Sequence, residues 1–368
     1  MPDTIRNTNI DILRLVFAFF IVFYHVRYLT NRFIYDFPQN GYLAVDFFFI
    51  VSGYMITRSC RENEKNGTEP GTLRYCFHKL MSFLPYLIVA EIFFGVVEGF
   101  SVIHTTNSFN RNFDLFFGAF WYHFQNVFCL SMLNLYNGDI TWYLSSLILS
   151  TLILYPFIRR SKVIFPRYVA PVFGVLLILT ILVVTGAINA PNHTTFGFIS
   201  KGLLRGLADM SLGIFAYELV TMMHAHRFRN DAIVYTVAEI ACLFLALLFM
   251  FIGNPARPEG REVFEFLVIL LIFVGTTVTF STLSLTYEWV KKAPVLVDNA
   301  KWMAVGSLMI YLVHGAVILI FNRWFDGAIY GVRLFLVVML TIGISVGLYV
   351  LGRMLGELMT KEIKKAVS

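Results

Sequence analysis

The feature that most constrains this chain is a series of apolar stretches, each long enough to cross a lipid bilayer. A membrane helix needs about 20 mostly apolar residues. Ten stretches of this kind lie near residues 11–29, 41–57, 80–100, 141–157, 169–188, 202–221, 232–252, 263–285, 302–321 and 331–352. The sequence therefore predicts an all-α, polytopic transmembrane helix bundle of about ten spans, organised as a single membrane-embedded domain over residues 1–368.

Charged residues are too few for a soluble protein of this length. Charged side chains make up 14% of the chain and hydrophobic ones 58%, whereas a soluble domain is about a quarter charged. Polar groups cannot cover a globular surface of this composition. We therefore expect an integral, multi-pass protein whose surface partner is membrane lipid.

One further apolar stretch, residues 112–136, is interrupted by polar side chains and decides the topology. If it does not cross and the N-terminus is cytoplasmic, 19 of the 29 Lys and Arg residues fall in inner segments and eight in outer segments. If it crossed, the basic clusters at 159–167, 291–301 and 361–365 would face outward, against the positive-inside tendency. The charge pattern therefore predicts two cytoplasmic termini and an outer re-entrant or interfacial segment at 112–136.

Cysteine spacing and net charge exclude several other classes of protein. Cys60, Cys76, Cys129 and Cys242 form no C-x-x-C pair, and no His/Cys spacing indicates a metal site. The net charge of +6 arises from basic residues in short segments between apolar stretches, which is a membrane-topology pattern. The sequence predicts neither a bound metal nor a nucleic-acid partner.

The first apolar stretch carries two ionisable residues on one helical stripe. It also holds Asp11 and lacks a small-x-small cleavage site, so we expect a retained helix rather than a signal peptide. Arg14 and His25 are 11 residues apart, which places both side chains on the same face and about 16 Å apart along the axis. Arg14 snorkelling or pairing with Asp11, and His25 packing as a structural histidine, are the alternatives to a functional site.

Other polar residues are expected at similar depths. Asp46, in the second stretch, lies at nearly the depth of His25, where a carboxylate can fix the tautomer of an imidazole. His314 in the ninth stretch could reach the same layer. The small pair Ser52-Gly53 permits close approach of either a neighbouring helix or a ligand.

Several motifs resemble those of the acyltransferase-3 family of integral membrane enzymes. Arg14, ten residues and His25 resemble the family signature R-x10-H. Residues 41–53 resemble the pattern G-x-x-x-V-x-x-F-F-x-x-S-G, and later blocks follow in order: Trp142 to Ser145, Tyr155-Pro156, Arg205-Gly206 with Gly213, and Ser307 to His314. The resemblance extends over about residues 8–350.

The resemblance implies a function and a location. Similar proteins have about ten core helices and move an acetyl or related acyl group from a cytoplasmic donor, usually acetyl-CoA, to a carbohydrate. It implies an O-acyltransferase of the bacterial inner membrane that modifies a cell-surface or lipid-linked glycan. Succinyl-CoA or another acyl-CoA is an alternative donor, and both direct transfer and an acyl-histidine intermediate are open.

The resemblance also suggests residue roles. His25 is the expected general base, oriented or assisted by Asp46 or His314. The expected donor-binding residues are Arg14, Ser52, Gly53, Tyr54, Arg58 and Lys79. The expected acceptor-binding residues are Trp142 and Tyr143 at an outer mouth, and Arg205, for which structural pairing with Asp209 is the safer interpretation.

Two positions depart from the family pattern. Members often have R-x-x-R-x-x-P at the start of the third span, where this chain has Lys79, Ser82 and Pro85. The acidic residue of the family's W-x-L-x-x-E is replaced by Leu147. Donor phosphate contacts are therefore expected to be weaker or made elsewhere, and any role of the family's glutamate is lost or relocated.

Two other functions remain compatible with buried charges in ten spans. A secondary transporter, or a flippase for a sugar or lipid-linked glycan, is the main alternative. Such proteins often have two related halves with matching broken helices, and no such symmetry is visible here. A non-catalytic subunit or sensor is the other alternative, which the shared stripe of Arg14 and His25 disfavours.

Overall fold

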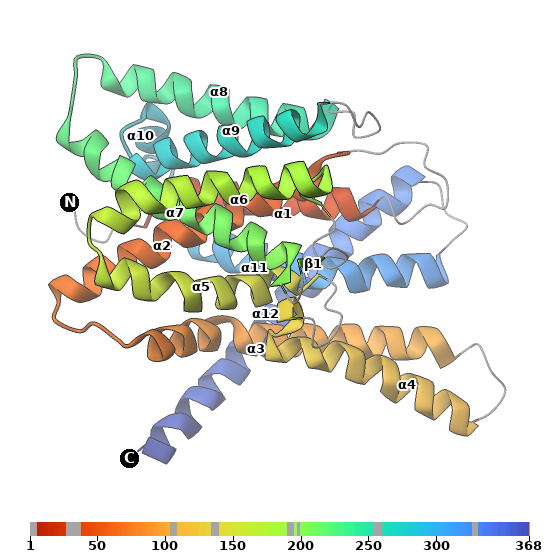
Figure 1. Ribbon diagram of the computed structural model, residues 1–368. Coiled ribbons are helices and arrows are strands. Elements are labelled where there is room, and N and C mark those ends of the chain that lie inside the picture. The colour runs from red at the N-terminus through yellow and green to blue at the C-terminus, as the bar shows by residue number, and fades with distance from the viewer. Residues whose placement is uncertain are drawn as a thin grey trace.

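Helices dominate the computed structural model, which describes residues 6–26, 38–103, 109–133, 140–189, 195–196, 199–252, 260–325 and 330–367. The long helices are α1 (Thr8–Val26), α2 (Ala44–Lys65), α3 (Thr72–Ile103), α5 (Trp142–Arg160), α6 (Ala170–Thr185), α7 (Lys201–Ala225), α8 (Asp231–Ile252), α9 (Arg261–Ser281), α11 (Pro294–Trp324) and α12 (Tyr330–Val367). Each corresponds to one of the predicted spans. The all-α polytopic bundle is therefore confirmed (Figure 1).

Shorter elements connect the long helices. They are η2 (Gly41–Leu43), α4 (Phe109–Phe124), η3 (Gln125–Phe128), η4 (Ser131–Leu133), η5 (Phe165–Val169), α10 (Leu285–Lys291) and the antiparallel strand pair β1 (Thr195–Phe196) and β2 (Ile199–Ser200). The sequence did not predict α10 or the strand pair. Both are too short to carry a strong periodic signal.

Helix α7 lies at the centre of the bundle. In the described part of the chain, nine helices are long and apolar enough to cross a membrane, and α7 is not one of them. It carries Lys201, Arg205, Asp209 and Glu218, and all four are buried. Because these charges contact protein rather than lipid, α7 serves as the polar core against which α2, α5, α6 and α9 pack.

Glycines allow α2 and α7 to approach very closely. A Cβ atom on Gly53 would lie 2.0 Å from the carbonyl oxygen of Met210, and one on Gly213 would lie 2.0 Å from that of Ile50. No side chain fits at such distances, so both positions need glycine. The contact brings the polar groups of α2 within reach of those of α7.

The segment that begins at residue 112 does not cross the bundle as a separate span. Helix α4 has 16 residues, fewer than the roughly 20 that a membrane span needs, and it runs back along the second half of α3 (Figure 1). Phe116 and Phe120 of α4 pack over Gly99 and Gly95 of α3. This hairpin agrees with a re-entrant or interfacial segment, although residues 134–136 lie outside the described residues.

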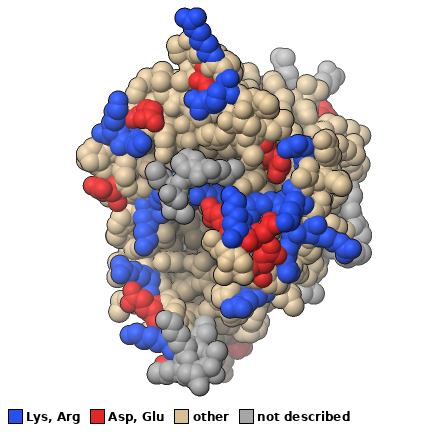
Figure 2. Space-filling model, turned by 90° about the vertical axis from the view of Figure 1, so that its left-hand side faces the viewer, with Lys and Arg blue, Asp and Glu red and all other residues tan. Residues whose placement is uncertain are grey.

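Basic side chains gather at one end of the bundle. The first turn of α1 and the last turns of α12 lie at the same end (Figure 1), as a chain with both termini on one side requires. Figure 2 shows this end, where Lys and Arg side chains surround a hollow in the middle of the face. The cytoplasmic orientation of this end remains a prediction from the positive-inside tendency.

Candidate active site

Two histidines from distant parts of the sequence meet inside the bundle. Helices α1 and α11 pack along each other, which brings His25 Nδ1 to 3.1 Å from His314 Nε2. Their ring centroids are 5.0 Å apart, and His314 is fully buried. The structure therefore joins two of the three residues predicted to be catalytic.

Backbone carbonyls determine where the protons sit on this histidine pair. His314 Nδ1 lies 2.6 Å from the carbonyl oxygen of Tyr311. A carbonyl can only accept, so Nδ1 carries the hydrogen and Nε2 of the neutral ring is an acceptor. His25 Nδ1 faces that acceptor and also the carbonyl of Ile21 at 3.1 Å. His25 must therefore donate from Nδ1, which leaves the lone pair on its Nε2.

This hydrogen-bond pattern allows His25 to act as a base with His314 as its support. A proton taken up at Nε2 of His25 leaves the ring positively charged. The Nδ1–H group of His25 then donates to the neutral His314 Nε2 acceptor, and this contact stabilises the cation. The pair has the base-and-orienter arrangement that general base catalysis uses.

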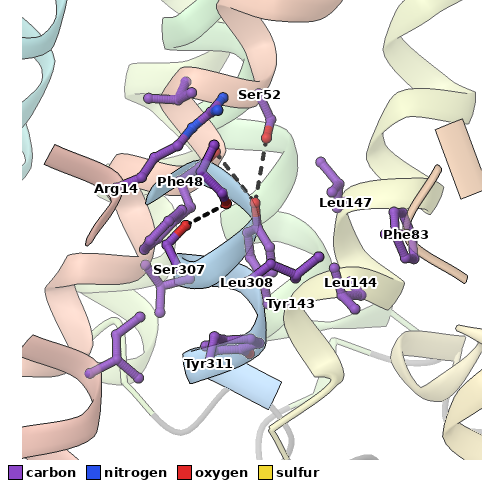
Figure 3. Close-up of a pocket in the computed structure, with 14 residues that line it drawn as sticks. Arg14, Phe48, Ser52, Phe83, Tyr143, Leu144, Leu147, Ser307, Leu308 and Tyr311 are labelled. Carbon is purple, nitrogen blue, oxygen red and sulfur yellow. Dashed lines mark hydrogen bonds between the residues drawn. The ribbon is translucent and has the colours of Figure 1, made fainter. Parts of the chain in front are cut away.

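A pocket lies beside α1, with Arg14 among the residues that line it (Figure 3). It has a volume of about 160 Å³ and lies between α1, α2, α3, α5 and α11. Arg14 lines one part of it and Ile21 and Tyr311 line another. The backbone carbonyls of Ile21 and Tyr311 contact His25 and His314. This part of the pocket therefore adjoins residues that hold the histidine pair, although neither histidine is among the residues that line it.

The pocket walls are apolar with a few hydroxyl groups. The apolar lining consists of Ile21, Val45, Phe48, Val51, Phe83, Leu144, Leu147, Ala304 and Leu308, and the hydroxyls are those of Ser52, Tyr143, Ser307 and Tyr311. Ser52 Oγ and Tyr143 Oη point toward each other and are 3.4 Å apart (Figure 3). A contact this long is weak, so a ligand amide or carbonyl can displace it. Apolar walls with few polar groups are typical of ligand sites.

Arg14 is incompletely neutralised. Its Nη1 donates to Asp11 at 3.1 Å, but the other carboxylate oxygen of Asp11 accepts from Arg6 Nε at 2.5 Å. Lys79 of α3 lies within electrostatic range of Arg14 and adds a further positive charge. The Arg14 side chain remains 26% exposed. The Asp11 carboxylate is therefore shared by Arg6 and Arg14, and Lys79 adds a further positive charge nearby. This excess of positive charge suits the site for an anionic ligand.

Asp46 has a different partner from the one predicted. It does not orient His25, because both of its oxygens accept from Arg205, at 2.7 and 2.9 Å. Arg205 also donates to the carbonyl of Tyr42 and lies over the ring of Trp142. The predicted Arg205–Asp209 pairing is replaced by this pair, because the close α2–α7 contact lets Arg205 reach Asp46 with both ends of its planar group.

The other predicted donor residues divide between the two faces of α2. Ser52 lines the pocket. Gly53 instead packs on α7, and Tyr54 stacks on Phe280 with ring centroids 3.6 Å apart, so neither is among the residues that line the described pocket. Arg58 lies further along α2 and pairs with Glu62 at 2.7 Å.

Trp142 and Tyr143 are buried rather than placed at an exposed outer mouth. Each side chain is 9% exposed, because α5 begins inside the bundle. Trp142 lies beneath Arg205, whereas the Tyr143 hydroxyl faces the pocket. Leu147, one turn further along α5, also lines the pocket, so the position of the missing glutamate borders this site.

Sequence reasoning missed several pocket residues. Ser307 and Tyr311 precede His314 by seven and three residues, so helical spacing places them on the same face. That spacing could have identified both. Phe48 and Phe83 carry no such signal, because many aromatic residues in these helices contact lipid or other helices.

These features define a class of protein. The chain is an integral, multi-pass membrane protein in which Arg14 lines a pocket between the helices and a histidine pair lies next to that pocket. Among the described residues, no group of three or more His, Cys, Asp or Glu is placed to hold a metal ion.

Comparison with protein families narrows this class. The sequence model described as an acyltransferase domain matches residues 7–350. The chain therefore belongs to this family, the acyltransferase-3 family that its motifs resemble, and is a membrane acyltransferase. No curated protein and no solved structure matched the chain.

Proposed function

We propose that the protein transfers an acetyl or related acyl group from cytoplasmic acyl-CoA to a hydroxyl of a cell-surface or lipid-linked carbohydrate. The observation that carries this proposal is a pocket lined by Arg14 and by Ile21 and Tyr311, whose carbonyls contact the paired His25 and His314. An acyl-CoA has an anionic end and a reactive thioester at opposite ends of a long, weakly polar arm. The pocket offers a cation and apolar walls, and the proposed base, His25, adjoins its Ile21 side.

The donor would enter with its thioester end leading. Its phosphates would remain near Arg14, Arg6 and Lys79, where positive charge exceeds negative charge. The two amides of its arm require hydrogen-bond donors and acceptors, and the hydroxyls of Ser52 and Tyr143 provide both. The thioester would then reach the end of the pocket beside Ile21, next to His25.

The reaction follows from the protonation states of the histidine pair. His25 Nε2 takes the proton of the acceptor hydroxyl while that oxygen attacks the thioester carbonyl. The new C–O bond forms, the C–S bond breaks, and the thiolate takes the same proton from His25. The proton thus passes from hydroxyl to thiol, with no net uptake or release. His314 stabilises the transient imidazolium.

Transfer in this direction assigns each substrate to one side. The donor would arrive at the end of the bundle where Lys and Arg side chains gather. The positive-inside tendency places this end in the cytoplasm of a bacterial inner membrane. The glycan hydroxyl would approach from the opposite end. Arg205 then acts as a structural residue rather than an acceptor ligand, since Asp46 already neutralises it.

The proposal can be tested with purified protein in lipid nanodiscs. Radiolabelled acetyl-CoA and a membrane glycan extract are added, and label in the glycan is counted for wild type, His25→Ala and Lys292→Ala. Loss of a general base typically costs 10²–10⁴-fold in rate, so His25→Ala should be nearly inactive. Lys292→Ala, an exposed position outside the pocket, should match wild type.

Two results would contradict the proposal. One is full activity of the folded His25→Ala variant. The other is absence of thioester turnover with acetyl-, propionyl- and succinyl-CoA, combined with uptake of unmodified sugar into sealed vesicles, which identifies a transporter. A quench experiment without acceptor separates the two chemical routes, because only an acyl-histidine intermediate retains label on the protein.

A further inference from the structure

The last helix continues well past the acyltransferase domain. The family match ends at residue 350, but α12 extends to Val367. Figure 1 shows this extension leaving the bundle beyond α3. It has no place in the proposed reaction, so its surface calls for a separate explanation.

The extension crosses α3 at two glycines and then diverges from it. A Cβ atom on Gly352 would lie 2.6 Å from Cδ1 of Tyr86, and one on Gly356 would lie 3.3 Å from Cγ of Pro85. At this crossing the two helices border an open groove of about 540 Å³, here called the α3–α12 groove. Its lining comprises Met81, Ser82, Pro85, Tyr86, Gly352, Arg353, Gly356, Glu357, Thr360 and Lys361.

The groove carries a net positive charge. Arg353 Nε pairs with Glu357 at 3.1 Å, and both side chains are more than 60% exposed. Lys361 lies on the same side of α12, eight residues after Arg353, and is not part of that pair. Hydroxyls of Ser82 and Thr360 also border the groove. These hydroxyls already donate to the carbonyls of Lys79 and Gly356, so the exposed ammonium of Lys361 is the group suited to bind a phosphate.

The surroundings of the groove indicate the membrane interface. Leu351, Met354 and Leu358 on α12 are each more than half exposed, and their spacing places them on one stripe beside the charged stripe. Near the groove, Tyr349 stacks with Tyr86 and contacts Trp302, which is 48% exposed. Aromatic residues of this kind mark the headgroup level of a bilayer.

We propose that the α3–α12 groove binds the phosphate headgroup of an anionic phospholipid. Basic residues immediately beyond the end of a membrane helix attract anionic lipids, and the exposed apolar stripe can contact acyl chains of the same leaflet. The donor nucleotide is a poorer fit for the groove. Phe83 faces the donor pocket, whereas Ser82, Pro85 and Tyr86 face the groove, so α3 stands between the two sites.

The test measures lipid binding directly and does not depend on the transferase reaction. Full-length protein in a neutral detergent is titrated with dioctanoyl-phosphatidylglycerol or dioctanoyl-phosphatidylcholine, and the Tm is followed. A ligand that binds the folded state raises the Tm with concentration. Wild type should respond to phosphatidylglycerol at lower concentration than to phosphatidylcholine. Lys361→Gln should weaken the phosphatidylglycerol response about fivefold, the effect of one basic residue.

A matched variant separates the groove from general surface charge. Lys292→Gln removes an exposed lysine that directly follows α10 and lies outside the groove, and should retain the wild-type response. Equal responses of wild type and Lys361→Gln, or equal responses to the two lipids, would overturn the proposal. A Lys361-dependent response to adenosine 3′,5′-bisphosphate without one to phosphatidylglycerol would also overturn it and assign the groove to the nucleotide.

Discussion

Two arginines at membrane depth, Arg14 and Arg205, have opposite surroundings. Arg205 is 1% exposed and donates twice to Asp46 and once to the carbonyl of Tyr42. Arg14 is 26% exposed and makes one bond to Asp11, which it shares with Arg6. A guanidinium with its own carboxylate holds helices together, whereas one that shares a carboxylate beside a pocket remains able to bind an anion.

The largest expected effect is the loss of stability that follows when Arg205 is replaced. Arg205→Ala leaves the Asp46 carboxylate buried without its partner, which typically costs 3–5 kcal/mol. We expect a sharply lower Tm and little folded protein in detergent. The double variant Arg205→Ala/Asp46→Ala should recover part of the loss, because it removes the unpaired charge. A single variant with wild-type Tm would show that the pair is not structural.

His123 on α4 is another buried cation, and it should stabilise the packing of helices as Arg205 does. Burial alone would lower the pKa of His123, but hydrogen bonds and the negative charges of Glu91 and Glu98 raise it to about 9. His123 contacts both carboxylates and stacks on Phe94. It therefore joins α4 to α3 as a charged group at neutral pH.

The sign of this shift gives a pH dependence. Because the folded-state pKa lies above the ordinary 6.5, the stabilisation is complete below pH 6.5 and is lost as pH rises through about 9. One pKa unit corresponds to about 1.4 kcal/mol, so a rise of the pKa from 6.5 to about 9 implies a loss that approaches about 3 kcal/mol. Tm measurements from pH 6 to 10 should fall more for wild type than for His123→Gln. Parallel curves would contradict this role.

Arg14 should affect binding rather than stability. Hydrogen bonds to charged groups contribute about 1.5–3 kcal/mol, so Arg14→Ala should raise the KM for acyl-CoA by at least tenfold with a small change in Tm. The same variant should be indistinguishable from wild type with acyl-pantetheine, which lacks the nucleotide phosphates. A lowered kcat with both donors would instead place Arg14 near the reacting atoms.

The smallest effect is expected from a pocket hydroxyl. Tyr143→Phe removes one hydrogen-bonding group that faces the donor arm, worth about 0.5–1.5 kcal/mol, so the KM for the donor should rise about threefold to tenfold. Tyr54→Phe is the matched control, because Tyr54 stacks on Phe280 away from the pocket. Equal effects of the two substitutions would remove Tyr143 from the donor site.

Hydropathy and helical periodicity predicted how deep each residue lies in the membrane and which face of its helix it occupies. They did not predict which helices are neighbours. The ten spans and the shared stripe of Arg14 and His25 follow from patterns along one chain segment. The lateral order of helices is not encoded in such patterns, so Asp46 appeared as a candidate partner of His25. The structure gives that place to His314, because α1 packs mainly along α11, and it gives Asp46 to Arg205 through the Gly53–Gly213 contact.

Residue types that have several ordinary roles were the hardest to place. Ser52 and Gly53 are adjacent, yet one faces the pocket and the other faces α7. The dipeptide Ser52-Gly53 alone does not indicate which of its residues faces the pocket and which faces the neighbouring helix. Trp142 and Tyr143 were expected at an outer mouth, but α5 starts inside the bundle and buries both.

The distance between the cation and the base on α1 has a consequence for regulation under the proposed function. Arg14 and His25 are separated by three helical turns, about 16 Å, so the residue that holds the phosphates has no contact with the acyl group. It cannot distinguish loaded donor from spent CoA, which keeps every phosphate. Free CoA should therefore compete with acyl-CoA at similar concentrations, and the enzyme would respond to the ratio of the two pools rather than to the amount of donor alone.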